Sequence, residues 1–408
     1  MKYVILLGDG MADYPLPELQ GKTPLQAAHT PHMDRIAAEG TLGLIDTIPA
    51  GLTPGSDVAN LSVLGYDPMV YHTGRGPLEA ASMGVSLAPD DVAFRCNLVT
   101  LGETAETVME DFTAGHISSE EARRIVEDLD AELGSPEIGF YPGVGYRHLM
   151  VYRGGPTALK TIPPHDITGR PIAGYLPKGK GSDQIGHLME CSRAILKDHP
   201  VNRDRMAEGK KTADSIWLWG EGRAPAMKPL TARYGIKGGI ISAVDLLKGI
   251  GVYAGLDILP VEGATGYTDT NYRGKAERAL EYLRNGDFVF LHVEAPDEMG
   301  HEGDTEGKIR AIEDFDREVV GTVLAGTPSL KDVRVMVLSD HPTPIELKTH
   351  SSDPSPFAVL SSADGENAGT GNPYSEASAG DTGIVVSPGH LLMDWFMKDW
   401  RGFLEEKR

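Results

Sequence analysis

Residues 3–10 read YVILLGDG, and this stretch decides the fold class. A short apolar run that ends at a flexible Gly-Asp-Gly turn is typical of a strand buried on both faces of a parallel sheet. Ligands of such sheets lie beyond the carboxyl ends of the strands. Asp9, which directly follows this predicted strand, is therefore the first candidate site residue.

Strands and helices alternate on both sides of the chain's middle. Thr-Pro pairs at 23–24 and 30–31 place an N-cap residue before a proline at the first helical position, which predicts two helix starts. Apolar patterns predict strands at 42–48, 286–294 and 333–338, helices at 58–64, 240–250 and 308–324, and a loop at 295–304. This alternation predicts an α/β protein with a mainly parallel sheet flanked by helices.

The chain has 408 residues, which is too long for one compact core. Its middle part differs in texture, with a predicted helix at 118–133, predicted strands at 148–152 and 215–219, and glycine-rich connections. We therefore predict a discontinuous core domain, residues 1–88 and 226–408, into which a smaller α/β domain, residues 89–225, is inserted.

The net charge of −21, from 59 acidic and 38 basic residues, argues against nucleic acid or an anionic membrane as a partner. The net charge does not exclude a small anionic substrate, provided that the protein supplies a local cationic pocket or a bound cation. Two cysteines cannot form a disulfide framework, and no apolar run approaches the roughly 18 residues of a membrane span. The N-terminus turns polar too early for a signal peptide, so we expect a cytoplasmic protein. The sequence is compatible with a homo-oligomer.

The strongest candidate site lies toward the C-terminus. Asp297 and His301 follow one predicted strand, Asp340 and His341 follow another, and His350 comes shortly after. Carboxylates and imidazoles at neighbouring strand ends suit a catalytic Zn²⁺ or Mn²⁺ ion, and the aspartate after the first strand adds to the set. Ligand type does not separate these ions from Co²⁺ or Mg²⁺.

Ser56 is the candidate nucleophile. It ends a Gly/Pro-rich loop and precedes a predicted helix, whose N-terminus is its positive end. No Gly-x-Ser-x-Gly elbow or Ser-His-Asp triad surrounds it, so a helix terminus or a metal would have to activate the hydroxyl. The alternative is that Ser56 only caps the following helix.

Several motifs resemble one family when they are taken together. They are LGDGMAD (7–13), TPHMD (30–34), PGSD (54–57), LGYDP (64–68), GRGP (74–77), PDEMGH (296–301) and SDH (339–341). In this order they resemble the archaeal-type cofactor-independent phosphoglycerate mutases of the alkaline phosphatase superfamily. The resemblance implies an alkaline-phosphatase-like core and two divalent metal ions, without 2,3-bisphosphoglycerate.

The resemblance also implies roles for single residues. It places Asp297, His301 and His350 at one metal, and Asp9, Asp340 and His341 with the Ser56 oxygen at the other. Ser56 would take the phosphoryl group of 3-phosphoglycerate as phosphoserine, and the reoriented glycerate would take it back to give 2-phosphoglycerate. Candidates for binding the substrate are Arg147, His165, Asp166, Arg223 and Lys248, with Arg75 as a further residue that could reach it.

Two other enzymatic functions share this machinery. A homoserine kinase-like phosphotransferase of the same family remains an alternative, although no P-loop is present. A metal-dependent phosphomonoesterase would differ only in the access of water. A non-catalytic protein of this fold is disfavoured because no expected ligand is missing. His292, inside a predicted apolar strand, is interpreted as a core histidine rather than a ligand.

Overall fold

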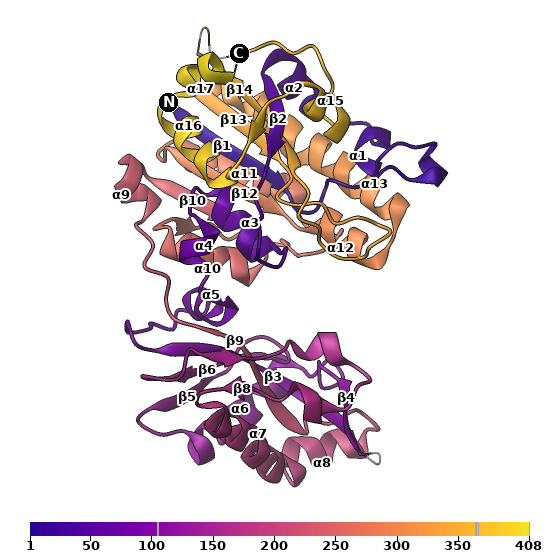
Figure 1. Cartoon of the computed structure of the whole chain (residues 1–408), viewed down its shortest axis with the longest axis vertical. Helices are drawn as coiled ribbons and strands as arrows, with labels where there is room; N and C mark the ends of the chain where they lie inside the picture. The colour runs from indigo at the N-terminus through magenta and orange to yellow at the C-terminus, as the bar shows by residue number, and fades with distance from the viewer. Residues whose placement is uncertain (104–105, 364, 366, 408) are drawn as a thin grey trace. The chain divides into compact units, whose positions relative to one another are not determined.

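A computed structural model of the chain describes residues 1–103, 106–363, 365 and 367–407 (Figure 1). Two compact units make it up. The core unit contains Met1–His72 and Ala226–Arg408, and the inserted unit contains Thr73–Pro225. Within the described ranges, every helix is too short or too polar to cross a bilayer.

The core unit is built on an eight-stranded sheet in the order β11-β10-β12-β1-β13-β14-β2-β15. Its strands are β1 Lys2–Gly8, β2 Thr41–Ile45, β10 Gly238–Ile241, β11 Asp257–Ile258, β12 Phe288–Val293, β13 Val333–Leu338, β14 Ser355–Ser361 and β15 Val385–Val386. Every strand runs parallel to β1 except β14. β1 lies between two parallel partners, which explains why its apolar run is buried. The predicted α/β class with a mainly parallel sheet is confirmed.

Helices cover the sheet of the core unit. They are α1 Pro24–Ala27, α2 Pro31–Glu39, α3 Ser56–Val63, α4 Pro68–Tyr71, α9 Leu230–Tyr234, α10 Asp245–Tyr253, α11 Tyr272–Leu283, α12 Ala295–Glu302, α13 Thr305–Asp314, a π-helical turn Phe315–Val320, α14 Gly321–Gly326, α15 Glu376–Asp381, α16 Leu392–Lys398 and α17 Trp400–Lys407. Both predicted Thr-Pro helix starts are confirmed, and the Thr23 side chain accepts a hydrogen bond from the Gln26 amide in a capping box.

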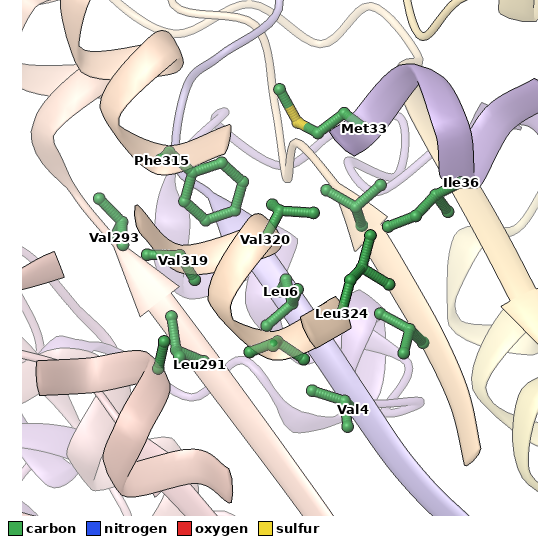
Figure 2. Close-up of a cluster of buried hydrophobic side chains, with 14 of the residues drawn as sticks. Val4, Leu6, Met33, Ile36, Leu291, Val293, Phe315, Val319, Val320 and Leu324 are labelled. Atoms are coloured by element: carbon green, nitrogen blue, oxygen red, sulfur yellow. The ribbon is translucent and has the colours of Figure 1, made fainter. Parts of the chain in front are cut away.

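Alternation along β1 separates the two faces of this sheet. Val4 and Leu6 point into one cluster with α2 and with the helical run from α13 to α14, as Figure 2 shows. Tyr3 belongs to the opposite face, where its ring contacts Phe396 of α16 edge-on at 5.7 Å between centroids. Each fully buried Val or Leu contributes about 1.5–3 kcal/mol, so this packing holds the strand ends in fixed positions.

Two predicted elements of the core unit were wrong. Residues 240–250 were expected to be one helix, but β10 ends at Ile241 and α10 begins only at Asp245. A short apolar run does not distinguish a buried strand from a buried helix, which explains the error. Residues 295–304 were expected to be a loop, but α12 occupies most of them, because Pro296 lies in its first turn, where a missing N–H costs nothing.

The inserted unit has its own antiparallel sheet, in the order β4-β3-β6-β5 with β9 also paired to β3. Its elements are α5 Arg75–Ser82, β3 Val92–Glu103, β4 Thr107–Asp111, α6 Ser119–Leu133, β5 Ile138–Tyr141, β6 Arg147–Tyr152, β7 Leu159–Lys160, β8 Lys178–Gly179, α7 Ser182–Lys197, α8 Pro200–Ala207 and β9 Ser215–Gly222. Trp217 and Cys96 are among its buried core residues. The predicted helix at 118–133 and both predicted strands are present.

The first boundary of the inserted unit differs from the predicted one. The inserted unit begins at residue 73 and ends at residue 225, whereas the prediction gave residues 89–225. The reason is α5, whose Ala80 is buried against Ala93 of β3 and Leu149 of β6. A Cβ at Gly76 would lie 2.2 Å from the Ala93 carbonyl oxygen, so the helix is in close contact with this sheet.

Candidate metal centre and arginine cluster

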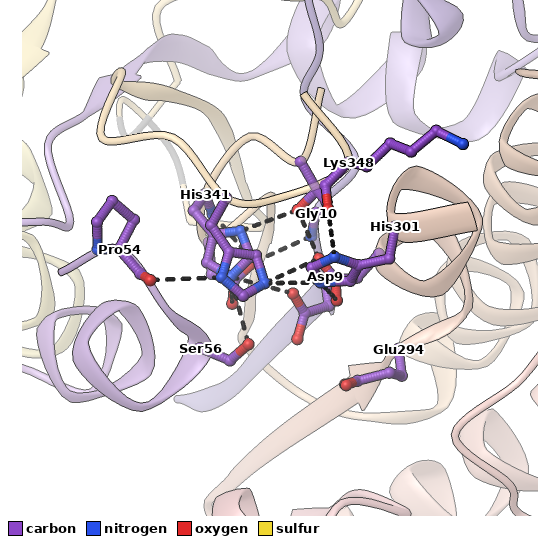
Figure 3. Close-up of polar contacts among 12 residues, drawn as sticks. Asp9, Gly10, Pro54, Ser56, Glu294, His301, His341 and Lys348 are labelled. Carbon is purple, nitrogen blue, oxygen red and sulfur yellow. Dashed lines mark hydrogen bonds and ion pairs between the residues drawn. The ribbon is translucent and has the colours of Figure 1, made fainter. Parts of the chain in front are cut away.

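The parallel strands β1, β12 and β13 end at the same edge of the core sheet. Gly8 is level with Val293, and Leu7 is level with Leu338. The residues that follow these ends are therefore brought together, as predicted for Asp9 and Asp340. Figure 3 shows the polar side chains that converge there. We call this set, Asp9, Ser56, Asp297, His301, Asp340, His341 and His350, the acidic edge.

Three residues form the first group of the acidic edge. Asp297 and His301 lie one turn apart on α12, and His350 comes from the loop after β13. His301 Nε2 lies 3.2 Å from Asp297 Oδ2, and His350 Nε2 lies 3.5 Å from Asp297 Oδ1. The two Nε2 atoms are 3.0 Å apart. All three side chains therefore point at one small volume.

The other ring nitrogen of each histidine contacts a backbone carbonyl. His301 Nδ1 lies 3.0 Å from the Lys348 oxygen, and His350 Nδ1 lies 3.4 Å from the Pro54 oxygen. A carbonyl can only accept, so these contacts assign the protons to Nδ1 in the neutral rings. Two Nε2 lone pairs then face each other, an arrangement that a divalent cation between them satisfies.

The second group surrounds Ser56. Its metal-type ligands are Asp9, Asp340 and His341, all fully buried. His341 Nε2 lies 3.4 Å from Asp9 Oδ1, 3.6 Å from Asp340 Oδ2 and 3.3 Å from Ser56 Oγ. Ser56 is the first residue of α3 and is only half-buried. A substrate can therefore reach its hydroxyl, whereas the three ligand-type side chains around it are buried.

The electrostatics of the acidic edge fit a cation. Burial and the neighbouring Asp340 carboxylate raise the pKa of Asp9 well above its usual range. Asp9 Oδ1 is buried, and no hydrogen-bond partner for it exists among the described residues. Burial would also raise the pKa of Asp297, but hydrogen bonds from His301 and His350 outweigh it and hold that pKa well below the usual range. Divalent cations would compensate these carboxylates and use the free oxygen.

Sequence reasoning missed part of the surroundings of Asp9. His292 is fully buried, as expected, and Ser242 contacts its Nδ1 at 3.2 Å. Its Nε2, however, lies 2.8 Å from Asp9 Oδ2 and 3.3 Å from Glu294 Oε2, so it also supports the site. Glu294 follows β12 directly, and that position was the signal available in the sequence.

Asn60 was also missed, and it links Ser56 to the second group. Its side-chain amide donates to Asp340 Oδ2 at 2.8 Å and to the Ser56 carbonyl at 2.9 Å. Asn60 lies one turn after Ser56 on α3, so the helical repeat brings it to the same side. It holds the start of α3 against the Asp340 side chain.

The inserted unit contains a second polar cluster, which we call the arginine cluster: Arg75, Arg95, Arg147 and His165. Besides burial, the positive charges of Arg75 and Arg147 lower the pKa of Arg95. Besides burial, the positive charges of Arg75 and Arg95 lower the pKa of His165. The Arg95 guanidinium stacks on the Trp219 ring at 4.3 Å and pairs with Glu79 at 2.8 Å. Burial lowers the pKa of both Arg95 and His165.

Strand register explains the positions of Arg95 and Arg147 in this second cluster. Arg95 lies opposite Trp219, and two residues further along β3 Asn97 lies opposite Arg147. Paired residues share a face of an antiparallel sheet, so these four side chains line one face. Arg147 is exposed at the start of β6. The cluster thus offers guanidinium groups, which bind carboxylates and phosphates.

The remaining substrate-binding candidates have simpler surroundings. Asp166 is exposed and lies 3.6 Å from His165 Nε2. Arg223 pairs with Asp90 at 3.5 Å, beyond the end of β9. Lys248, on α10 of the core unit, pairs with Asp245 at 3.0 Å on the same helix. Their substrate-binding roles stay predictions.

Fold and site together define an α/β protein with candidate metal-binding groups of carboxylates and imidazoles beside a serine at a helix start. The sequence profile of a family described as 2,3-bisphosphoglycerate-independent phosphoglycerate mutase matches residues 37–202. A probable 2,3-bisphosphoglycerate-independent phosphoglycerate mutase from Geobacter sulfurreducens is 55% identical, covering 97% of this chain and 100% of its own length. The enzyme of that name from Methanosarcina barkeri is 56% identical over 94% of this chain and 97% of its own. The chain belongs to the family of 2,3-bisphosphoglycerate-independent phosphoglycerate mutases.

Solved structures agree with this assignment. A Pyrococcus horikoshii protein superposes with a TM-score of 0.81 at 31% identity, covering 98% of this chain and 97% of its own. The cofactor-independent phosphoglycerate mutase of Thermoplasma acidophilum gives a TM-score of 0.65 at 26% identity, with 98% and 99% covered. The likeness extends over the inserted unit as well as the core unit.

Proposed function

We propose that this chain interconverts 3-phosphoglycerate and 2-phosphoglycerate through a phosphoserine at Ser56. The observation that carries the proposal is the position of Ser56 Oγ, 3.3 Å from His341 Nε2 at the meeting point of two carboxylate and imidazole groups. Relatives that are 51–56% identical over most of the chain bear the mutase name. The reaction belongs to glycolysis and gluconeogenesis, and we expect it to occur in the cytoplasm.

The residues present fit two divalent ions, for which Mn²⁺ and Zn²⁺ are our first choices and Co²⁺ and Mg²⁺ the alternatives. Asp297, His301 and His350 would hold one, and Asp9, Asp340 and His341 with Ser56 Oγ the other. Such ions, when bound, polarise phosphoryl oxygens and lower the pKa of a bound hydroxyl.

Ser56 would carry out both phosphoryl transfers. Its Oγ attacks the phosphorus of 3-phosphoglycerate, the bond to the substrate oxygen breaks, and the freed glycerate hydroxyl takes up a proton in place of the one that Ser56 lost. The neighbouring glycerate hydroxyl then attacks the phosphoserine and restores the serine hydroxyl. The start of α3 places backbone N–H groups and a positive helix end beside the transferred group.

The substrate carboxylate needs its own partner during this reaction. We propose that the arginine cluster supplies it, because its guanidinium groups suit a carboxylate and Arg147 is exposed. Water would also have to be kept from the phosphoserine, since hydrolysis would turn the enzyme into a phosphatase.

The test mixes metal-depleted protein with Mn²⁺ and 3-phosphoglycerate and follows 2-phosphoglycerate and free phosphate together. We expect the isomer without phosphate from the native chain and neither from Ser56→Ala. Phosphate without isomer would show a phosphomonoesterase instead. Neither product, from protein that demonstrably binds Mn²⁺, would contradict the mutase and favour the homoserine phosphotransferase.

A further inference from the structure

Thr343 lies between the two groups of the acidic edge. It is fully buried in the loop after β13, two residues beyond His341. Its Oγ1 lies 2.5 Å from Asp297 Oδ1, in the first group, and 3.2 Å from His341 Nδ1, in the second. One hydroxyl therefore contacts a ligand of each group.

The direction of these two hydrogen bonds follows from chemistry. The ionised Asp297 carboxylate can only accept, so the single Thr343 hydroxyl proton is donated to it. The hydroxyl oxygen then accepts from His341 Nδ1–H. This assigns the lone pair of His341 to Nε2, which faces Ser56 and the two aspartates of the second group. Loss of the hydroxyl would leave both the carboxylate and the imidazole without this restraint.

The backbone around Thr343 is held just as firmly. The buried Lys308 ammonium, paired with Asp13 at 2.6 Å, donates to the Thr343 carbonyl at 2.8 Å. A Cβ at Gly10 would lie 2.6 Å from Thr343 Oγ1, and one at Gly300 would lie 2.5 Å from the Thr343 carbonyl oxygen. The loop after β1, α12 and the loop after β13 thus meet at this residue. Its hydroxyl cannot move without moving a neighbour.

We propose that Thr343 is a positioning residue that couples the two metal groups, its hydroxyl fixing Asp297 and His341 relative to each other. This inference rests on the proposed two-metal function. Partners that orient metal ligands typically change metal affinity by about 10- to 100-fold when they are removed. Because Thr343 joins the two groups, binding of a metal ion to one group should also raise the affinity of the other group for its ion.

The experiment measures Mn²⁺ binding by calorimetry and by electron paramagnetic resonance, independently of turnover. Thr343→Val removes the hydroxyl at nearly constant shape, and Thr343→Ser keeps it. Thr41→Val is the matched control. Thr41, at the start of β2, is fully buried like Thr343, but its hydroxyl has no hydrogen-bond partner among the described residues. We expect cooperative binding of two ions in the native chain, the Ser variant and the control, and binding about 10- to 100-fold weaker and non-cooperative in Thr343→Val.

A second measurement keeps the test decisive if the Val variant folds poorly. Nitrogen-15 shifts of the His341 ring in metal-free protein report its tautomer, and Thr343→Ala serves as the second hydroxyl-free variant. We expect Nδ1–H in the native chain and a mixture of tautomers without the hydroxyl. Native chain that binds two ions, with unchanged affinity and tautomer in the hydroxyl-free variants, would overturn the coupling alone. Native chain that binds no Mn²⁺ would overturn the proposed function and the coupling with it.

Discussion

The acidic edge of the core unit and the arginine cluster of the inserted unit are opposites in charge and in construction. The acidic edge gathers residues that follow parallel strands, so its side chains converge from loops and helix starts. The arginine cluster takes Arg95 and Arg147 from paired antiparallel strands, whose side chains share one sheet face, and adds Arg75 from α5 and His165 from a helical turn. A chain with a net charge of −21 thus holds a local concentration of guanidinium groups.

Burial disfavours the charged form of a side chain in each region, a carboxylate in the first and a guanidinium in the second. Asp9 keeps a buried oxygen without a hydrogen-bond partner among the described residues, and burial and Asp340 raise its pKa. Burial lowers the pKa of Arg95, whose guanidinium group pairs with Glu79 and stacks on the Trp219 ring. Cations would complete the first region and an anion the second. The difference teaches that one chain can form a site for cations from residues at strand ends and, in a separate unit, a group of cationic side chains that suits carboxylates and phosphates.

The largest expected effect comes from removing the nucleophile. Ser56→Ala should abolish isomer formation and any labelled phosphoserine, a loss of at least about 10⁴-fold in kcat, as for other nucleophiles that form a covalent intermediate. Ser62→Ala on the same helix is the control, because Ser62 Oγ donates to the Thr47 carbonyl, away from Ser56. Residual phosphoserine in Ser56→Ala, detected by mass spectrometry, would show that another residue carries the phosphoryl group.

The next effect tests the arginine cluster. Arg147→Met should lower kcat/KM by about 10- to 100-fold, because a charge-assisted hydrogen bond is worth about 1.5–3 kcal/mol. Arg153→Met is the matched control from the same segment, since Arg153 bonds the Pro136 carbonyl. Steady-state kinetics with 3-phosphoglycerate check both. Equal kinetics for the two variants would remove this region from the substrate site.

A pH dependence sharpens the account of the acidic edge. A hydrogen bond that the His301 ring donates to the Asp297 carboxylate raises the pKa of His301 to about 9 in the metal-free protein. This pair stabilises the metal-free fold below the unfolded histidine pKa of about 6.5, and the contribution is lost as pH rises through about 9. Metal binding needs the neutral ring, so Mn²⁺ affinity should rise by up to about tenfold per pH unit from pH 7 to 9. Calorimetry in buffers of different ionisation enthalpy would count the released proton, and a flat profile would contradict this assignment.

The smallest effect has opposite signs with and without metal. Asp9→Asn removes a buried charge beside Asp340, so the metal-free protein should gain on the order of 1 kcal/mol of unfolding free energy. The same variant should lose the increase in stability that Mn²⁺ gives the native chain. Urea unfolding with and without Mn²⁺ measures both. A metal-free variant less stable than the native chain would show that the His292 contact outweighs the charge repulsion.

Sequence reasoning reached most residues of the acidic edge because Asp9 and Asp340 follow apolar strands closely and because Asp297 and His301 lie one helical turn apart. Their roles as metal ligands stay predictions. Sequence reasoning failed where contacts depend on packing across the fold. Thr343 and Glu294 follow strands too, but residue type alone does not separate a supporting hydroxyl or carboxylate from a surface one. Arg95 was missed because its partners, Trp219 and Glu79, are distant along the chain.

The sequence by itself determined the strands β1, β12 and β13, the residues at their ends and the family, because local apolar pattern and motif order carry that information. Only the tertiary structure decided that two histidine Nε2 atoms face each other and that one hydroxyl joins both groups. It also decided that α5 belongs to the inserted unit. These features depend on side-chain directions and on strand register between distant segments, which no local pattern records.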